Sequence, residues 1–185
     1  GNEGGTYNSY GNALSVCLSE KMKNTEVSAV TTNGSASNIR LLNEGLVQFA
    51  IVQNDTLRDA FEGNGSFSAE GPAKDVRALA GLYMEVCQIV VPAGSDIRTV
   101  SDLNGKSISV GVPESGVVAN TFQILEAYGI SVDMINPLYM SFTESAEAMM
   151  DGQIDAFFCT ASPSVSVLHD LASSMDIRLL YLDAR

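Results

Sequence analysis

The stretch from Ser107 to Tyr128 constrains the fold most, because it combines a predicted strand, a tight loop and a helix. Residues 107–112 alternate polar and apolar side chains, which is typical of a strand. Pro113 and Gly116 interrupt that alternation. From residue 117 onward the apolar positions recur at helical spacing, namely Val118, Phe122, Leu125 and Tyr128. The sequence therefore predicts an α/β fold.

The loop before this helix has the chemistry of an anion site. Ser115 is a candidate N-cap, because its hydroxyl can accept a hydrogen bond from an early helical N–H. Several N–H groups of the loop are expected to point outward at the positive end of the helix dipole, which suits a negative charge. Capping alone also explains a serine here, so Ser115 has two interpretations.

A second glycine-containing loop, Gly4–Gly11, precedes another predicted helix. That helix is predicted over Asn12–Lys23, with an apolar stripe of Leu14, Cys17, Leu18 and Met22. We expect the two loops to face each other across a cleft, with the rest of the chain holding them there.

Length and charge narrow the classes of function. The 185 residues suffice for one domain or two small ones with a real core, and the formal net charge is −12. Nucleic acid and anionic membrane surfaces are disfavoured as partners, because phosphate binding needs clustered Lys and Arg. No apolar run reaches the about 20 residues that span a bilayer. No signal-peptide pattern is present in these residues, although a mature chain would have lost one.

The three cysteines, Cys17, Cys87 and Cys159, have neither metal-ligand spacing nor the even number of a disulfide framework. Each falls on a predicted apolar helix face or in a predicted strand, so we expect buried free thiols. Cys159 also lacks a basic partner that would lower its pKa, which argues against a nucleophilic role.

The remaining pattern predicts strands that alternate with helices. The predicted strands are residues 27–31, 46–52, 76–83, 86–91, 138–141, 154–159 and 177–182. Further helices are predicted after the turn 32–35, over 56–61, over 143–150 with Thr143 as N-cap, and from Pro163 onward. Residues 101–103 are predicted to form a capped turn, and residues 63–75 a mobile surface loop.

One order of elements occurs twice. Residues 41–45 lead into an apolar strand that ends in Gln53-Asn54-Asp55, and residues 149–152 lead into one that ends in Thr160-Ala161-Ser162. The pattern predicts two similar α/β lobes that present polar groups at the carboxyl ends of strands, where ligands bind in open α/β sheets. Chance similarity between two common α/β units is the alternative.

A set of short segments covers nearly the whole chain in a specific order. They are Gly4–Tyr7 with Gly11, Thr32–Ser35 with Asn38–Leu42, Phe49–Asp55, Arg77–Ala80 with Leu82–Tyr83, Asp102–Lys106, Gly111 with Ser115–Gly116, and Asp151–Phe158 with Thr160. This ordered set resembles the periplasmic solute receptors of the TAXI branch of TRAP transporters.

The resemblance implies a two-lobe α/β fold of the type II periplasmic-binding-protein kind, with three-layer α/β/α lobes and a hinge near residues 82–91. Lobe I would comprise residues 1–87 and lobe II residues 88–185. Members of the family have a strand before the first loop and a C-terminal segment that returns to lobe I. Lobe I is therefore expected to be partial here, as in a fragment or a processed form.

The function that the resemblance implies is that of a periplasmic, or otherwise extracytoplasmic, receptor. It would capture a small carboxylate-bearing solute, such as glutamate, glutamine or a related organic acid, between its lobes. It would then deliver that solute to a TRAP-type ion-coupled permease. No cofactor, metal or nucleic acid is expected.

The predicted binding site is rich in hydroxyls, amides and backbone N–H groups. It comprises Gly5, Thr6, Tyr7, Thr32, Asn33, Gly34, Ser35, Gln53, Asn54, Pro113, Ser115, Gly116, Val117 and Thr160. Because no Lys or Arg falls in a predicted cleft loop, a carboxylate would be held by N–H groups, hydroxyls and helix dipoles.

Each polar residue of this set also has a purely structural interpretation. Capping explains a hydroxyl at a helix start, as at Thr6 or Ser35. Tyr7 could pack on the first lobe, and Gln53 could form a turn. Glu114 is expected to face solvent; in the cleft it would favour an amine over an anion.

Two positions depart from the family pattern. Val117 stands where the family usually has a threonine, which removes one hydroxyl donor. Cys159 stands where a tyrosine is common. Both departures put the exact shape of the ligand in question.

A two-lobe enzyme or a ligand-sensing regulatory domain is the alternative function, because a fold does not fix a function. His169 is the only histidine and has no nucleophile at a telling spacing. The sequence contains none of the common nucleotide-binding, hydrolase or metalloprotease motifs. No catalytic residue is therefore predicted, and an enzyme is not expected.

Overall fold

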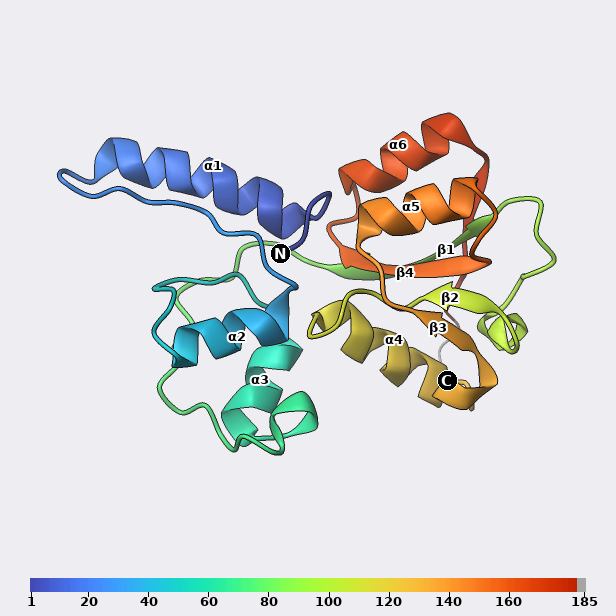
Figure 1. Cartoon of the computed structure of the whole chain (residues 1–185), viewed down its shortest axis with the longest axis horizontal. Coiled ribbons are helices and arrows are strands. Elements are labelled where there is room, and N and C mark those ends of the chain that lie inside the picture. Colours follow the sequence, from blue (N-terminus) through green and yellow to red (C-terminus); the bar gives the residue numbers. More distant parts are fainter. Residues whose placement is uncertain (183–185) are drawn as a thin grey trace. The chain divides into compact units, whose positions relative to one another are not determined.

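The computed structural model describes residues 1–182 and divides the chain into two compact units (Figure 1). The first unit consists of Gly1–Tyr83 together with Glu114–Gly116, and the second consists of the remaining residues. Within the described residues, every helix is too short or too polar to cross a membrane. The last predicted strand, residues 177–182, lies entirely within the described residues.

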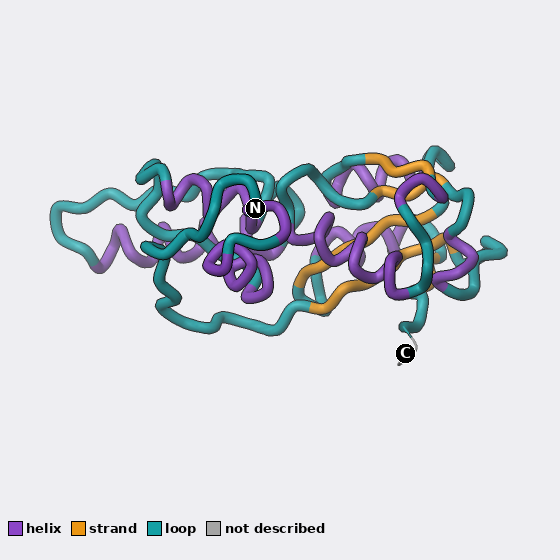
Figure 2. The backbone as a smooth tube through the Cα atoms, turned by 90° about the horizontal axis from the view of Figure 1, so that it is seen from below, coloured by secondary structure: helices purple, strands orange, loops and turns teal. Residues whose placement is uncertain are grey.

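The second unit is built on one mixed sheet of five strands, drawn in orange in Figure 2. The strands are β1 Val86–Pro92, β2 Ser107–Ser109, β3 Asn136–Leu138, β4 Ala156–Ala161 and β5 Ile177–Leu179. Their order across the sheet is β3-β2-β4-β1-β5. Strand β2 runs parallel to β3 and β4, whereas β1 runs antiparallel to β4 and β5. Strands therefore form at or beside five of the predicted positions. Strands β2 and β5 are shorter than predicted, β4 is shifted by two residues, and β3 shares only Leu138 with its predicted range 138–141.

Helices cover both faces of this sheet. They are α4 Gly116–Ala127, α5 Phe142–Met150 and α6 Ser166–Ser174, with short 3-10 turns η2 Val100–Leu103 and η3 Val132–Met134. Consecutive residues of β1, from Ile89 to Val91, are completely buried, which requires a cover on each face. Figure 1 shows α5 and α6 together over one face and α4 on the other. This arrangement confirms a mixed α/β fold in which helices flank the sheet.

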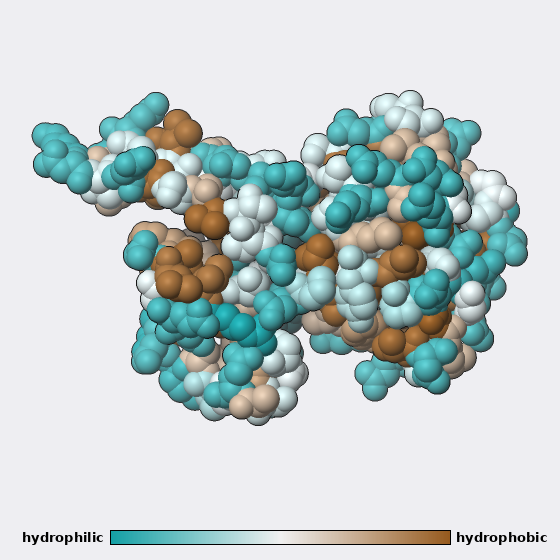
Figure 3. Space-filling view, viewed as in Figure 1, coloured by the Kyte–Doolittle hydropathy of each residue, from teal (hydrophilic) through white to brown (hydrophobic). Residues whose placement is uncertain are grey.

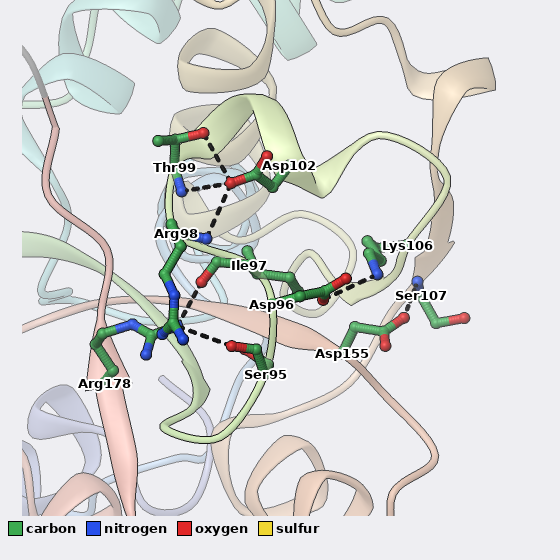
Figure 4. Close-up of polar contacts among 10 residues, drawn as sticks. All are labelled: Ser95, Asp96, Ile97, Arg98, Thr99, Asp102, Lys106, Ser107, Asp155 and Arg178. Atoms are coloured by element: carbon green, nitrogen blue, oxygen red, sulfur yellow. Dashed lines mark hydrogen bonds and ion pairs between the residues drawn. The ribbon is translucent and has the colours of Figure 1, made fainter.

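Polar contacts around η2 fix the loop between β1 and β2 (Figure 4). The Asp102 carboxylate accepts hydrogen bonds from the backbone N–H groups of Arg98 and Thr99, at 2.9 and 2.8 Å. These bonds lower the pKa of Asp102. Arg178 of β5 donates to the carbonyl groups of Ala93 and Ile97, which holds the same loop to the sheet edge. The predicted capped turn at residues 101–103 is confirmed.

Two predicted helix starts in the second unit are wrong. The N-cap of α5 is Ser141, not Thr143: Ser141 Oγ accepts from the N–H of Glu144 at 3.3 Å, and Glu144 Oε2 accepts from the N–H of Ser141 at 2.8 Å. This reciprocal capping box outcompetes a lone threonine. Pro163 lies in a turn before α6, which begins only at Ser166.

The first unit contains three helices and a small core. The helices are α1 Thr6–Lys21, α2 Ser35–Asn43 and α3 Asn54–Glu62, followed by the 3-10 turn η1 Gly65–Phe67. The buried apolar residues are Ala36, Ile39, Ala60, Phe67 and Ala73. Residues 63–75 were predicted to be a mobile surface loop, but Phe67 is completely buried against α2 and α3 and anchors the segment.

Helix α1 differs from the prediction in its start and in its packing. It begins at Thr6 rather than Asn12, because the backbone turns helical directly after the extended residue Gly5. None of its residues is buried, so the predicted apolar stripe lies largely in solvent. Cys17 is exposed for the same reason, Cys87 is half-buried and only Cys159 is buried. The expectation of three buried thiols is therefore wrong for two of them.

Three predicted strands of the first unit do not form. Residues 27–31, 46–52 and 76–83 contain no strand, and in residues 1–182 no ladder pairs them with one another. Their large apolar side chains are consequently exposed, as at Val30 (62%), Phe49 (68%) and Leu79 (78%). Figure 3 shows brown, hydrophobic side chains on the molecular surface. A strand exists only with a partner, so apolar pattern alone does not produce one.

Candidate functional site

The start of α2 is held to the segment before α3 by buried polar contacts. Ser35 Oγ accepts a hydrogen bond from the backbone N–H of Gln53 at 3.0 Å, and both residues are buried. Asn38, one turn further along α2, donates from Nδ2 to the carbonyl of Ile51 at 2.8 Å. Thr32 donates its hydroxyl to Asn38 Oδ1 at 2.6 Å. These contacts bring three of the predicted site residues, at positions 32, 35 and 53, into one cluster.

The residues Glu114–Gly116 group with this cluster, although they are distant in sequence. The carbonyl of Glu114 accepts from the backbone N–H groups of Ala36 and Ser37, at 3.1 and 3.2 Å. Helix N-termini have N–H groups without intrahelical partners, and two of those in α2 are satisfied by this carbonyl. An anion at this helix end would therefore have to replace the Glu114 carbonyl.

Two glycines permit the close approach of these segments. Gly34 has φ of +132°, and a Cβ added to it would lie 3.2 Å from the Cα of Ser115. A Cβ added to Gly116 would fall 1.3 Å from Oε1 of Gln53. Any side chain at position 116 would therefore displace the Gln53 amide. Positions 34, 53, 115 and 116 thus form one packed group. We use the name α2 cluster for this group together with the residues bonded to it: Thr32, Gly34, Ser35, Asn38, Gln53, Ser115 and Gly116.

Arg40, in the last turn of α2, forms ion pairs beside the α2 cluster. Its guanidinium pairs with Glu70 at 2.8 Å and with Glu114 at 3.3 Å, and it lies 5.0 Å from the ring centroid of Phe67. The hydrogen bond to Glu70 and the two negative charges raise the pKa of Arg40. The Glu114 side chain is exposed to 49%, in agreement with the expected solvent-facing position, but it is also an ion-pair partner.

The first glycine loop joins the cluster through residue 1. Gly5 is buried, Thr6 and Tyr7 are half-buried, and α1 begins at Thr6. The carbonyl of Gly1 accepts from the N–H of Thr32 at 3.2 Å, and a Cβ on Gly1 would lie 2.6 Å from the Cβ of Tyr7. The Tyr7 ring is 6.5 Å from that of Tyr83 in an edge-on arrangement. Tyr7 therefore packs within the first unit, against Gly1 and Tyr83.

Asn33 and Asn54 are exposed at the edges of the cluster. Asn54 Oδ1 accepts from the N–H of Asp55 at 3.0 Å in the first turn of α3. Gln53 itself is the extended residue that precedes α3. The Asn54 side chain therefore stabilises the first turn of α3. Contact of Asn33 or Asn54 with a ligand stays a prediction.

Pro113, Val117 and Thr160 belong to the second unit. Pro113 is exposed, and Val117 is buried in the hydrophobic core of that unit. Thr160 pairs with Cys87 across β4 and β1 and is half-buried. Burial raises the pKa of the Cys87 thiol, and a hydrogen bond with Thr160 partly opposes that rise. Contact of these three residues with a ligand stays a prediction.

Sequence reasoning did not place Asn38 or the Glu114 carbonyl in the site. Asn38 could have been found, because a polar residue beside the fully buried Ile39 must satisfy its amide inside the protein. The role of the Glu114 carbonyl could not be predicted from the sequence, because every residue has the same backbone carbonyl group. Within residues 1–182, no group of three or more His, Cys, Asp or Glu side chains is placed so that it could hold a metal ion.

The family comparison covers the whole chain. The sequence model of the NMT1-like family matches residues 1–185, and the chain belongs to this family.

Solved structures with the same fold include several binding proteins. The alkanesulfonate-binding protein SsuA from Xanthomonas axonopodis pv. citri, bound to MOPS, is 23% identical with a TM-score of 0.64; the match covers 96% of this chain and 57% of that one. An ancestral arginine-binding protein bound to arginine is 16% identical with a TM-score of 0.61, covering 91% and 66%. The substrate-binding protein of an amino acid ABC transporter is 18% identical with a TM-score of 0.55, covering 92% and 65%.

These similarities establish a periplasmic-binding-protein fold of type II. The chain spans 57% to 66% of the length of the three structures.

Proposed function

We propose that this chain is part of an extracytoplasmic solute-binding receptor for a transporter, and not of an enzyme. The observation that carries the proposal is the α2 cluster, in which Ser35, Gln53 and Ser115–Gly116 converge on the N-terminus of a helix. Family membership and the fold support it, because the similar structures include proteins that bind an alkanesulfonate and arginine. The rival proposal, an enzyme or a sensor on the same scaffold, has no comparable observation.

The solute that we propose is small and carries a carboxylate, as in an amino acid or a related organic acid. Two N–H groups at the start of α2, those of Ala36 and Ser37, are already aligned on one carbonyl oxygen. A carboxylate oxygen can take the place of that carbonyl and adds a negative charge at the positive end of the helix dipole. Hydrogen bonds to a charged group contribute about 1.5–3 kcal/mol each, so three or four of them support micromolar binding. A sulfonate presents similar oxygens and is the competing solute class.

Amide chemical shifts test this geometry. On addition of the correct solute to the natural full-length protein, the resonances of Ala36 and Ser37 should be among those that shift most, since their acceptor changes. Saturable binding with no change at either amide would contradict the proposed place of the carboxylate, while leaving the receptor function intact.

A double substitution separates ligand contact from helix capping. We expect Ser115→Ala with Thr6→Ala to weaken solute binding far more than it lowers the free energy of unfolding without solute. The reason is that a hydroxyl that contacts a charged solute contributes more than one that only caps. Equal losses in calorimetric affinity and in urea stability would favour capping alone.

The transporter partner that we propose is a TRAP-type permease, on the strength of the TAXI-like segments. Another of the similar structures serves an amino acid ABC transporter, which makes an ABC permease the alternative. The neighbouring genes distinguish the two: a large multi-span permease without an ATPase supports the TRAP partner, and an ATPase gene beside a permease gene contradicts it.

A further inference from the structure

A groove on the first unit gathers an unusual share of the chain's positive charge. The groove has a volume of about 500 Å³ and lies between α3 and residues 74–78. Arg58, Lys74 and Arg77 line it, although the whole chain has only ten Lys and Arg against 22 Asp and Glu. Of the residues assigned to the candidate solute site, only Asn54 also lines this groove.

The three cations have no acidic partner within the described residues. The ion pairs of that part of the chain involve Arg40 and Lys106 instead. Lys74 Nζ donates to the carbonyl of Phe61 at 2.6 Å and lies 3.7 Å from the centroid of its ring. Arg77 donates to the carbonyl of Val76 at 3.0 Å, and Arg58 is exposed. No carboxylate is among the residues that line the groove.

Apolar side chains also line the groove. They are Leu57 and Phe61 of α3, together with Val76. Phe61 is exposed to 44%, with the Lys74 ammonium over one face of its ring. Cations beside an apolar floor match a ligand that carries carboxylates next to apolar side chains, because each kind of group then finds its complement.

We propose that this groove binds an acidic, amphipathic segment of a partner protein, in which carboxylates pair with Arg58, Lys74 and Arg77 and an apolar side chain lies on Leu57 and Phe61. The basic side chains that line the groove, Arg58, Lys74 and Arg77, are exposed, whereas sites for small molecules enclose most of their ligand. A peptide segment therefore fits it better than a small anion. The net charge of the chain is −12, so most of its surface is expected to repel a negatively charged partner, whereas Arg58, Lys74 and Arg77 attract one.

The test uses a fluorescently labelled peptide, Glu-Leu-Glu-Phe-Glu-Leu, titrated with the chain and followed by anisotropy. We expect saturable binding that weakens as ionic strength rises. The variant Arg58→Gln/Lys74→Gln/Arg77→Gln should lose about tenfold in affinity, as three exposed ion pairs imply. The matched control Lys21→Gln/Lys23→Gln/Arg98→Gln removes three exposed charges elsewhere and should keep the affinity of the parent chain.

Three results would overturn the proposal. One is the absence of binding, or equal binding of a peptide with Lys in place of each Glu. Another is equal loss of affinity in the two triple variants, with both retaining the parent circular-dichroism spectrum. The last is displacement of the peptide by citrate at a concentration as low as that of the peptide, which would identify a small-anion site. Amide shifts confined to residues 57–61 and 74–78 would support the proposed location directly.

Discussion

Ser35 holds the start of α2 to the segment before α3 through one buried hydrogen bond, from the N–H of Gln53. Ser35→Ala leaves that N–H buried without its acceptor, so we expect the free energy of unfolding to fall by about 1–3 kcal/mol. Urea denaturation measures the loss. Ser37→Ala is the matched control, because it lies in the same turn and is only half-buried; its effect should stay within about 0.5 kcal/mol. Equal losses for the two variants would contradict the role given to Ser35.

The cysteines provide a second residue-scale prediction. Cys17 is exposed, whereas Cys159 is completely buried and its pKa is strongly raised by that burial. The thiolate is the reactive form, so Cys17 should react with a thiol reagent at once and Cys159 only after unfolding. Cys17→Ser should remove the fast phase. A native Cys159 that reacts as fast as Cys17 would contradict the described packing of β4.

At the scale of elements, the turn η2 gives a pH dependence. Hydrogen bonds from the N–H groups of Arg98 and Thr99, and from the Thr99 hydroxyl, lower the pKa of Asp102 below its ordinary 3.8. Because the folded-state pKa is the lower one, the stabilisation is present above pH 3.8 and is lost as the pH falls through the folded-state pKa. Urea midpoints measured downward from about pH 5 should therefore fall less steeply for Asp102→Asn than for the parent chain. Parallel curves would contradict this account.

The three unpaired segments of the first unit give a prediction about local stability. Residues 27–31, 46–52 and 76–83 make no ladder with one another in the described structure, whereas β1 and β4 pair over five residue positions. Backbone amides in the three segments should exchange with solvent much faster than those of β1 and β4. Hydrogen exchange followed by mass spectrometry measures this. Protection of residues 46–52 equal to that of β4 would show that these residues do form a sheet.

The elements also show which part of the structure the sequence determines. Local signals suffice for η2, a turn that Thr99 and Asp102 cap and that ends at Leu103, and for α2 and α3. They do not suffice for residues 46–52, whose apolar run predicts a strand but which pair with no other strand within residues 1–182. In the candidate site, Ser35 and Gln53 were predictable as polar residues at element ends. Their contact with Ser115–Gly116 was not, because it joins segments about sixty to eighty residues apart in sequence.

At the scale of the whole molecule, a type II binding-protein fold carries the α2 cluster at the start of one helix. The cluster uses positions 34 and 116, where the spacing to Ser115 and Gln53 leaves little or no room for a side chain. The basic groove beside α3 is a separate feature, and its proposed partner is a protein rather than the solute. The solute claim and the groove claim therefore succeed or fail independently.

Calorimetry on the natural full-length protein, with a panel of amino acids, dicarboxylates, keto acids and sulfonates, tests the central claim most directly. We expect saturable heat with at least one carboxylate, accompanied by a rise in Tm, because a solute that binds only the folded state stabilises it. The Ser115→Ala/Thr6→Ala variant should show a reduced heat at the same solute concentration. Absence of heat and of any Tm rise across the whole panel would contradict the receptor function.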